Sequence, residues 1–157
     1  MIDIPANLPE IRPFHPDDLE RVQAFFAQMG GESRAFFNRG SWNEKKALRF
    51  FSESDDIQRF MAVDGDRMVG YLFLWDWDKS VPWLGIAVAE DWKGRHLGRK
   101  LMRHARDHAI LHGKGCILLT THIANLRGQG LYERCGYQRL GMHESGEVLY
   151  LLRFDAK

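Results

Sequence analysis

The feature that most constrains the fold is a strand–loop–helix stretch between residues 86 and 112. The apolar segment 86–88 is too short for a helix and is bounded by residues that break the apolar pattern, so it predicts a buried strand. From Gly98 onward, apolar side chains recur every three to four residues, which predicts an amphipathic helix over 98–112. Gly113 then ends that helix. The loop between strand and helix is basic and contains glycine.

The start of the predicted helix is suited to binding a phosphate or pyrophosphate group. The first backbone N–H groups of a helix have no partners inside it, and they lie at the positive end of the helix dipole. Gly94 and Gly98 let a ligand approach the main chain closely, and basic side chains surround the same point. The glycine spacing fits neither a Walker loop nor a dinucleotide-binding loop. An ordinary strand–helix connection with solvated basic residues is the competing interpretation.

The same stretch resembles the acetyl-CoA-binding segment of the GNAT superfamily of N-acetyltransferases. In that family a strand ends at a Val-like position and leads into Arg/Gln-x-x-Gly-x-Gly/Ala, and residues 93–98 occupy this slot. Lys93 stands where Arg or Gln is usual, and His96 stands where the first glycine is usual. A positive φ at His96 would cost on the order of 1 kcal/mol. The resemblance implies that acetyl-CoA contacts residues of the strand, the loop and the first helical turn: Ile86, Ala87, Val88, Lys93, Gly94, Arg95, His96, Leu97, Gly98 and Arg99.

A second segment resembles the GNAT pattern Asn-x-x-Ala-x-x-Leu-Tyr-x-x-x-Gly-Phe. Asn125, Leu131, Tyr132 and Gly136 match it. The resemblance implies that Asn125 hydrogen-bonds the pantetheine part of acetyl-CoA and that Tyr132 lies near its sulfur. Independently of the family, the pKa of a tyrosine is about 10 and that of a thiol is about 8.5. The tyrosine is therefore still protonated at neutral pH and can donate a proton to a leaving thiolate. A buried tyrosine that packs a helix on a sheet is the competing interpretation.

Direct attack on a thioester also needs a neutral amine, and therefore a base that acts directly or through water. Five titratable side chains fall near expected strand ends: Asp76, Asp78, Glu90, His122 and His143. We rank His122 and Asp76 first, as catalytic candidates beside Tyr132. His122 follows the strand 117–121 at its carboxyl end, where ligands gather in such sheets, and its intrinsic pKa is suitable. A solvated surface role is the competing interpretation for each of the five.

The remaining pattern predicts a mixed sheet. Strands are expected over seven segments: 11–14, 60–63, 68–75, 83–88, 117–121, 137–140 and 148–152. Further helices are expected over three segments: 16–29, 41–51 and 125–135. The order predicts an α/β (α+β) fold, in which a GNAT-like mixed, mostly antiparallel central sheet is flanked by helices on both faces, within a single domain over 1–157.

Alternate residues of one expected strand and its continuation are aromatic: Tyr71, Phe73, Trp75 and Trp77. Because strand side chains alternate between two faces, we expect all four on one face. Core packing is the first interpretation, and a wall for an apolar or planar acceptor is the second.

Composition narrows the classes of partner. A chain of 157 residues with a formal net charge of +1 has no global attraction to nucleic acid or to anionic membranes. The two cysteines, Cys116 and Cys135, and the scattered histidines predict neither a disulfide framework nor a metal site. The N-terminal residues show no signal-peptide pattern, and the apolar runs fall far short of the roughly 20 residues needed to span a bilayer. We therefore expect a cytoplasmic protein without nucleic-acid or membrane partners, and a homodimer is left open.

The function predicted from these observations is transfer of an acetyl group from acetyl-CoA to a primary amine by direct attack. The acceptor is a small molecule or a peptide, and the sequence does not identify it. The alternative hypothesis is a non-catalytic CoA-binding module that acts as a sensor or scaffold, which His96 supports and Tyr132 opposes. A nucleic-acid binder that uses the basic patch at 93–106 is a third hypothesis, which the neutral net charge and the lack of a binding motif oppose.

Overall fold

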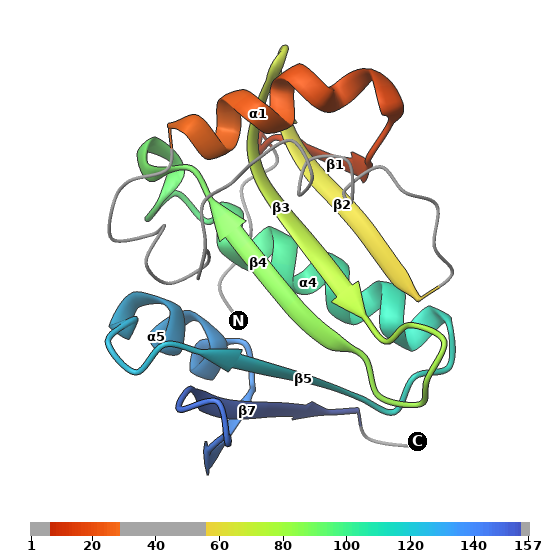
Figure 1. The fold of residues 1–157 in the computed structure, drawn as a ribbon, viewed down its shortest axis with the longest axis vertical. Coiled ribbons are helices and arrows are strands. Elements are labelled where there is room, and N and C mark those ends of the chain that lie inside the picture. Colours follow the sequence, from red (N-terminus) through yellow and green to blue (C-terminus); the bar gives the residue numbers. More distant parts are fainter. Residues whose placement is uncertain (1–6, 29–55, 155–157) are drawn as a thin grey trace.

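Figure 1 shows the computed structural model of the chain, which describes residues 7–28 and 56–154. Seven strands of this part form one sheet in the order β1-β2-β3-β4-β5-β7-β6. The strands are β1 Glu10–Pro13, β2 Ile57–Asp64, β3 Arg67–Trp75, β4 Trp83–Val88, β5 Cys116–Thr121, β6 Gln138–Met142 and β7 Val148–Arg153. The α-helices are α1 Leu19–Ala27, α4 Leu97–Leu111 and α5 Leu126–Arg134, and short 3₁₀ helices span Pro16–Asp18 and Glu90–Trp92. The predicted fold class is confirmed, and the helix expected over 41–51 lies outside the described residues.

The sheet is antiparallel except where β4 meets β5. Strands β1 to β4 form a meander, and β5, β7 and β6 form a second antiparallel set. The two sets join through one parallel register pair, Trp83 with Leu118, where the Leu118 N–H donates to the Pro82 carbonyl over 3.0 Å. Beyond this pair β4 continues along β3 and β5 continues along β7, and Figure 1 shows their arrows diverging. The sheet therefore opens into a wedge toward the carboxyl ends of β4 and β5.

Each face of the sheet is covered by apolar side chains of a different helix. On the α4 side, the buried cluster includes Leu72, Leu97, Leu101, Ile117 and Tyr150. On the α1 side, it includes Val22, Phe25, Phe26, Met61, Tyr71 and Phe73. Burial of this apolar area is the main force that holds the helices on the sheet. Helices therefore lie on both faces, as predicted.

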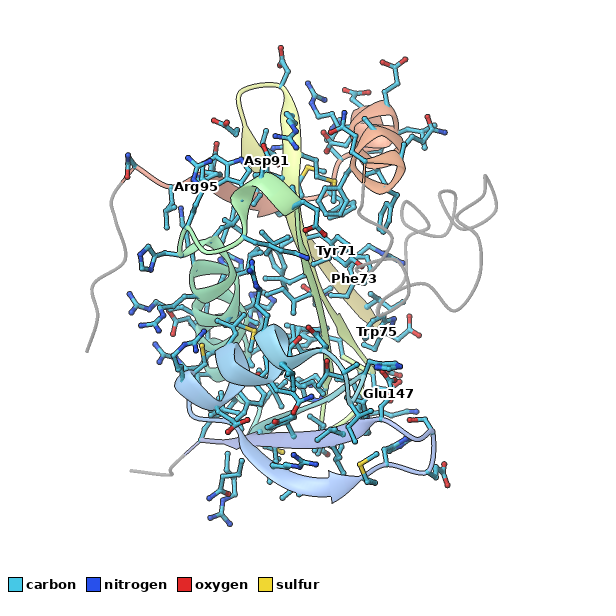
Figure 2. The ribbon with its side chains drawn as sticks, turned by 90° about the vertical axis from the view of Figure 1, so that its left-hand side faces the viewer. Tyr71, Phe73, Trp75, Asp91, Arg95 and Glu147 are labelled. Atoms are coloured by element: carbon cyan, nitrogen blue, oxygen red, sulfur yellow. The ribbon has the colours of Figure 1, made fainter. Side chains whose placement is uncertain are left out.

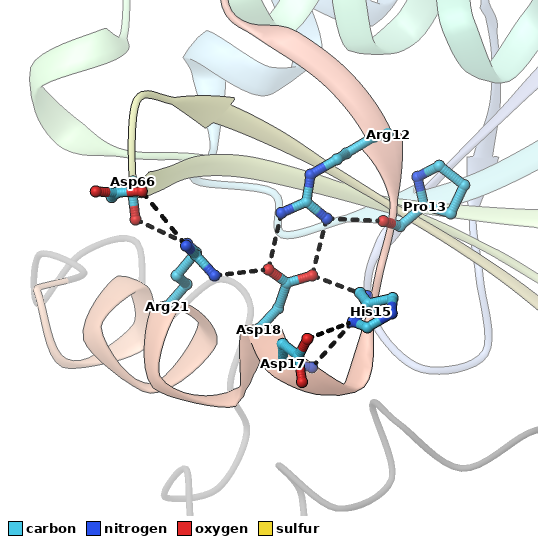
Figure 3. Close-up of polar contacts among 7 residues, drawn as sticks. All are labelled: Arg12, Pro13, His15, Asp17, Asp18, Arg21 and Asp66. Atoms are coloured by element: carbon cyan, nitrogen blue, oxygen red, sulfur yellow. Dashed lines mark hydrogen bonds and ion pairs between the residues drawn. The ribbon is translucent and has the colours of Figure 1, made fainter.

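A buried carboxylate connects β1, α1 and the β2–β3 turn (Figure 3). Asp18, whose side chain is only 1% exposed, accepts two hydrogen bonds of 2.8 Å from the Arg12 guanidinium and one of 2.8 Å from the His15 N–H. Arg21 donates to the same carboxylate over 3.2 Å and to the Asp66 carbonyl over 2.9 Å. The Arg12 hydrogen bond holds the pKa of Asp18 below its usual range. Charge and hydrogen bonding thus compensate for the burial of this carboxylate.

The aromatic row on β3 follows the prediction except at its end. The rings of Tyr71 and Phe73 lie 4.6 Å apart, and those of Phe73 and Trp75 lie 5.5 Å apart. Asp76 then adopts a positive φ of 53°, which turns the chain. Trp77 consequently packs against the α4-side cluster. The prediction that Trp77 shares the face of the other three is wrong, because side chains alternate regularly only while the backbone stays extended.

Trp77 packs on a row of three histidines along α4. The ring centroids of His104 and His108 lie 6.4 Å apart, those of His108 and His112 lie 4.3 Å apart, and Trp77 stacks on His108 at 4.9 Å. His108 Nε2 also lies 3.2 Å from Gln58 Oε1. Burial, with the neighbouring histidine rings, lowers the pKa of His108 to about 4. His108 is therefore packed in its neutral form at pH 7.

We expect the protein to lose stability as the pH falls from about 6.5 toward 4, because the unfolded His108 takes up a proton near its ordinary pKa of 6.5 and the folded one resists it. Thermal melts of the wild type and of His108→Gln at pH 7 and pH 5 test this. The variant should show a smaller decrease in melting temperature, whereas the exposed His122→Gln should behave like the wild type. Equal pH dependence in all three proteins would contradict the assignment.

Candidate active site

A cavity of about 700 Å³ opens where β4 and β5 diverge. Its lining comes from the end of β4, the loop that follows, the first turn of α4, and α5. This volume is in the range of small-molecule and cofactor sites. Most of the residues that the sequence assigned to acetyl-CoA lie in the lining: Ile86, Ala87, Val88, Lys93, Gly94, His96, Gly98, Arg99, Asn125 and Tyr132. The wedge therefore gathers the two sequence motifs into one site.

Two residues of the predicted set lie elsewhere. Leu97 is completely buried in the core on the α4 side of the sheet. The Arg95 guanidinium stacks on the Trp92 ring at 3.7 Å and donates to the Asp91 carbonyl over 3.4 Å. Figure 2 shows Arg95 beside Asp91. Leu97 thus anchors the helix start, and Arg95 packs against Trp92 and Asp91 within the loop.

The backbone of the loop is left-handed at two positions. Gly94 has a φ of 75°, and His96, the residue before the first turn of α4, has a φ of 70°. The conformation expected from the family pattern at His96 is therefore present, at a cost on the order of 1 kcal/mol. The His96 side chain makes no capping hydrogen bond to the helix. The amides of the first turn thus begin beside the cavity without a cap from that side chain.

Gly98 lies in the first turn of α4, beside side chains of α5 and β4. A Cβ atom at this position would lie 3.0 Å from Leu131 Cδ2 and 3.9 Å from Val88 Cγ2. The absence of a side chain therefore lets the first turn of α4 pack closely against α5 at the wall of the cavity.

The cavity is lined by an excess of positive charge. Four basic side chains, those of Lys93, Arg99, Arg127 and Arg134, face a single carboxylate, that of Glu90. Lys93 Nζ donates to Glu90 Oε1 over 2.8 Å. Together with the positive end of α4, these groups favour a ligand with several negative charges.

Tyr132 is buried in the wall of the cavity, with 4% of its surface exposed. Burial raises the pKa of its hydroxyl well above the ordinary value, and a hydrogen bond with Thr121 offsets part of that effect. Asn125 caps α5 by accepting from the Gly128 N–H over 3.2 Å, and its amide donates to the Thr121 hydroxyl over 3.0 Å. Thr121 therefore links the two residues of the second motif.

The two leading base candidates do not line this cavity. His122 is exposed, and its Nδ1 accepts a hydrogen bond from the Ala124 N–H over 3.0 Å. Asp76 follows Trp75, which pairs with Trp83 at the start of β4. The site lies near Val88 at the other end of β4, roughly 16 Å away at the usual rise of a strand. The structure therefore does not gather His122 and Asp76 around Tyr132.

Among the other candidates, Glu90 lines the cavity, and the His143 ring lies 5.8 Å from that of Trp83. Three residues near the site were not considered from the sequence: Thr121, Arg127 and Glu147. Glu147 precedes β7, which pairs with β5 in antiparallel register. A prediction of that pairing would have placed Glu147 beside the end of β5.

The acetyltransferase (GNAT) family model matches residues 20–137. The chain belongs to the GNAT acetyltransferase family. A curated relative, mycothiol acetyltransferase of Rhodococcus jostii, is 28% identical over 116 residues. The match covers 64% of this chain and 37% of that protein, so the chain spans little more than a third of the length of that relative.

Solved structures show that the chain shares the GNAT fold. The GNAT domain of S. lividans PAT superposes with a TM-score of 0.84 at 19% identity, over 92% of this chain and 89% of that one. The PaiA N-acetyltransferase of Thermoplasma acidophilum, solved in complex with coenzyme A, gives a TM-score of 0.74 at 17% identity, over 92% and 98% of the two chains. These likenesses concern the fold alone.

The left-handed backbone at His96 gives a test of the loop. We expect His96→Gly to keep its affinity for acetyl-CoA, because glycine adopts this conformation freely. His96→Val should weaken binding, because a β-branched residue adopts the left-handed conformation less readily than histidine does. Calorimetric titrations at pH 6 and pH 8 give both constants. Weakening of His96→Gly, greatest at pH 6, would instead show that the imidazole contacts the ligand.

Proposed function

We propose that this protein is an N-acetyltransferase that transfers an acetyl group from acetyl-CoA to a primary amine. The observation that carries the proposal is the wedge between β4 and β5, which is lined both by Tyr132 and by four basic side chains. An acyl-CoA needs these two features, because its phosphates are anionic and its thiolate must be protonated on leaving. The coenzyme A complex of the T. acidophilum neighbour supports the proposal.

The residues of the wedge suit the two ends of acetyl-CoA. Gly94, Gly98 and the first-turn amides of α4, with Lys93 and Arg99, would hold the pyrophosphate. In the described part of the chain, β4 pairs with β5 only at Trp83, so its main chain is open toward the wedge from there on. The two amides of pantetheine can pair with this strand edge as an added strand would.

In the proposed reaction, Tyr132 supplies a proton to the sulfur. The amine nitrogen bonds to the acetyl carbon, the carbon–sulfur bond breaks, and the thiolate takes the hydroxyl proton of Tyr132. The proton of the acylated nitrogen passes to water, which later reprotonates the tyrosine. Because burial raises the pKa of Tyr132, its hydroxyl remains protonated across the physiological range. The rate should therefore show no alkaline decrease due to this tyrosine up to about pH 10.

The acceptor and the setting belong to the same proposal. We propose a small-molecule or peptide amine as the acceptor and the cytoplasm as the location, and the chemistry uses no metal ion. No helix within residues 7–28 and 56–154 has the length and apolar character needed to cross a membrane. The alternative is a CoA-binding module without catalysis. Turnover measurements distinguish it from the proposed enzyme.

Binding of acetyl-CoA should raise the melting temperature, because a ligand that binds only the folded state stabilises it by about 2.7 kcal/mol at 100 times its dissociation constant. Arg99→Ala should weaken binding, since Arg99 lines the cavity. Arg106→Ala is the matched control, because Arg106 lies on the same helix and is paired with Asp107 at its surface. Absence of a shift at millimolar acetyl-CoA would contradict the proposed ligand.

Removal of the Tyr132 hydroxyl tests the chemical step. Tyr132→Phe should lower turnover roughly 10²–10⁴-fold, because general acid catalysis contributes that much. The dissociation constant of acetyl-CoA should change little, because the lost interaction belongs to the transition state. Tyr137→Phe is the control, since this neighbouring buried hydroxyl has no hydrogen-bond partner among the residues that the structure describes. Normal turnover of Tyr132→Phe in an assay of thiol release would show that Tyr132 only packs the helix on the sheet.

A further inference from the structure

Successive residues of β5 connect the site to the opposite face of the sheet. Ile117, Leu119 and Thr121 are buried on the side of α4 and α5, so Thr120 points to the other side. There the Thr120 hydroxyl donates to Glu147 Oε1 over 3.3 Å. Thr121, the next residue, hydrogen-bonds Tyr132 on the cavity side. A carboxylate and the proposed proton donor thus flank β5 from its two faces.

The position of Glu147 follows from the pairing of β5 with β7. Thr120 pairs with Leu149, and Glu147 is the diagonal neighbour of Thr120 on the same face. The His143 N–H donates to the Glu147 carbonyl over 2.7 Å, which closes the hairpin between β6 and β7. Glu147 is half-buried, and its charge is one of those that raise the pKa of Tyr132. The carboxylate is therefore held in place and lies within electrostatic reach of the tyrosine.

The aromatic row of β3 lies on the same side of the sheet. Trp75 is 40% exposed, and its indole covers Gly85 of β4, where a Cβ atom would collide with the ring. Trp75 pairs with Trp83, whose ring contacts His143 of the β6–β7 hairpin at 5.8 Å. Figure 2 shows Tyr71, Phe73 and Trp75 in a row that continues toward Glu147. Aromatic rings and one carboxylate thus lie on the face of the sheet opposite α4, and the tryptophans are beside the point where β4 and β5 stop pairing.

We propose that Glu147 binds the acceptor as an ammonium group and that the exposed Trp75 of the aromatic row, with its β4 partner Trp83, binds the body that carries it. This inference rests on the proposed function and adds an acceptor class, a cationic amine on an apolar or aromatic body. A carboxylate forms charge-assisted hydrogen bonds with an ammonium, and aromatic faces attract both apolar groups and cations. The ammonium loses its proton to water before attack, and Glu147 keeps the nitrogen beside the wedge.

The test compares two acceptors, phenethylamine and ethanolamine, by thiol release from acetyl-CoA. The wild type should have a kcat/KM for phenethylamine roughly 10–100-fold above that for ethanolamine. Glu147→Gln should raise the KM for phenethylamine by roughly 10–100-fold, the range for a hydrogen bond to a charged group, and change kcat less. Trp75→Leu should remove most of the preference between the two amines. Glu144→Gln, an exposed glutamate of the same hairpin, is the matched control and should leave both KM values unchanged.

The outcomes separate this inference from the proposed function. Equal use of both amines, or a Glu147→Gln variant that behaves like Glu144→Gln, would overturn the acceptor class and leave acetyl transfer intact. Absence of thiol release with either amine and with a mixture of other primary amines would overturn both. Titration of each variant with acetyl-CoA shows that the cavity is intact, and Trp75→Leu tests the same inference if Glu147→Gln does not fold.

Discussion

The divergence of β4 from β5 after one parallel pair is the constraint on which the rest of this structure depends. A fully paired β4 and β5 would satisfy the main-chain groups of both strands and leave no space between them. Here the pairing stops at Trp83 and Leu118, and the carboxyl half of β4 keeps an open edge beside a cavity of about 700 Å³. Unpaired edge groups away from water are costly, so this edge favours a ligand that carries amides. The antiparallel sets on either side, and the clusters under α1 and α4, hold the two strands apart.

The two non-glycine residues with positive φ in the described part serve different purposes. His96 turns the chain from the loop into α4, so that the uncapped first turn begins at the cavity. Asp76 ends the alternation of β3 and sends Trp77 to the opposite face, where it stacks on the neutral His108 of α4. Strained backbone persists where surrounding packing determines it, and fully buried neighbours such as Leu97 provide that packing at His96. The strain at His96 lies at the candidate site, whereas the strain at Asp76 organises the core.

Periodicity and turn residues were sufficient to predict the sheet and the crossover helix, because these depend on local pattern, and the resemblance to the GNAT motifs pointed to most of the predicted residues that line the cavity. To choose the general base, one must know which strand ends lie together in the sheet. Local sequence pattern does not give this arrangement. Asp76 follows β3 and Val88 ends β4, yet the two strands are antiparallel, so their carboxyl ends lie at opposite ends of the sheet. Glu147 was not considered because its place is set by the register of β7 on β5, which joins segments far apart in sequence. Arg95 illustrates a third limit, since its stacking on Trp92 depends on a loop conformation that composition does not specify.

Because side chains of β5 alternate between the two faces of the sheet, this strand connects the cavity with the aromatic row. Thr121 faces the cavity and contacts Tyr132, while Thr120 faces the aromatic row and contacts Glu147. An acyl donor that enters from the side of α4 and an amine that enters from the side of α1 would meet at the open end of the wedge, with one strand between their binding groups. Such an arrangement places basic side chains around the phosphates and a carboxylate beside the ammonium. Because the strand separates them, the basic side chains and the carboxylate do not neutralise each other. The separation is possible only because β4 and β5 stop pairing, since a continuous sheet would close the passage between its two faces.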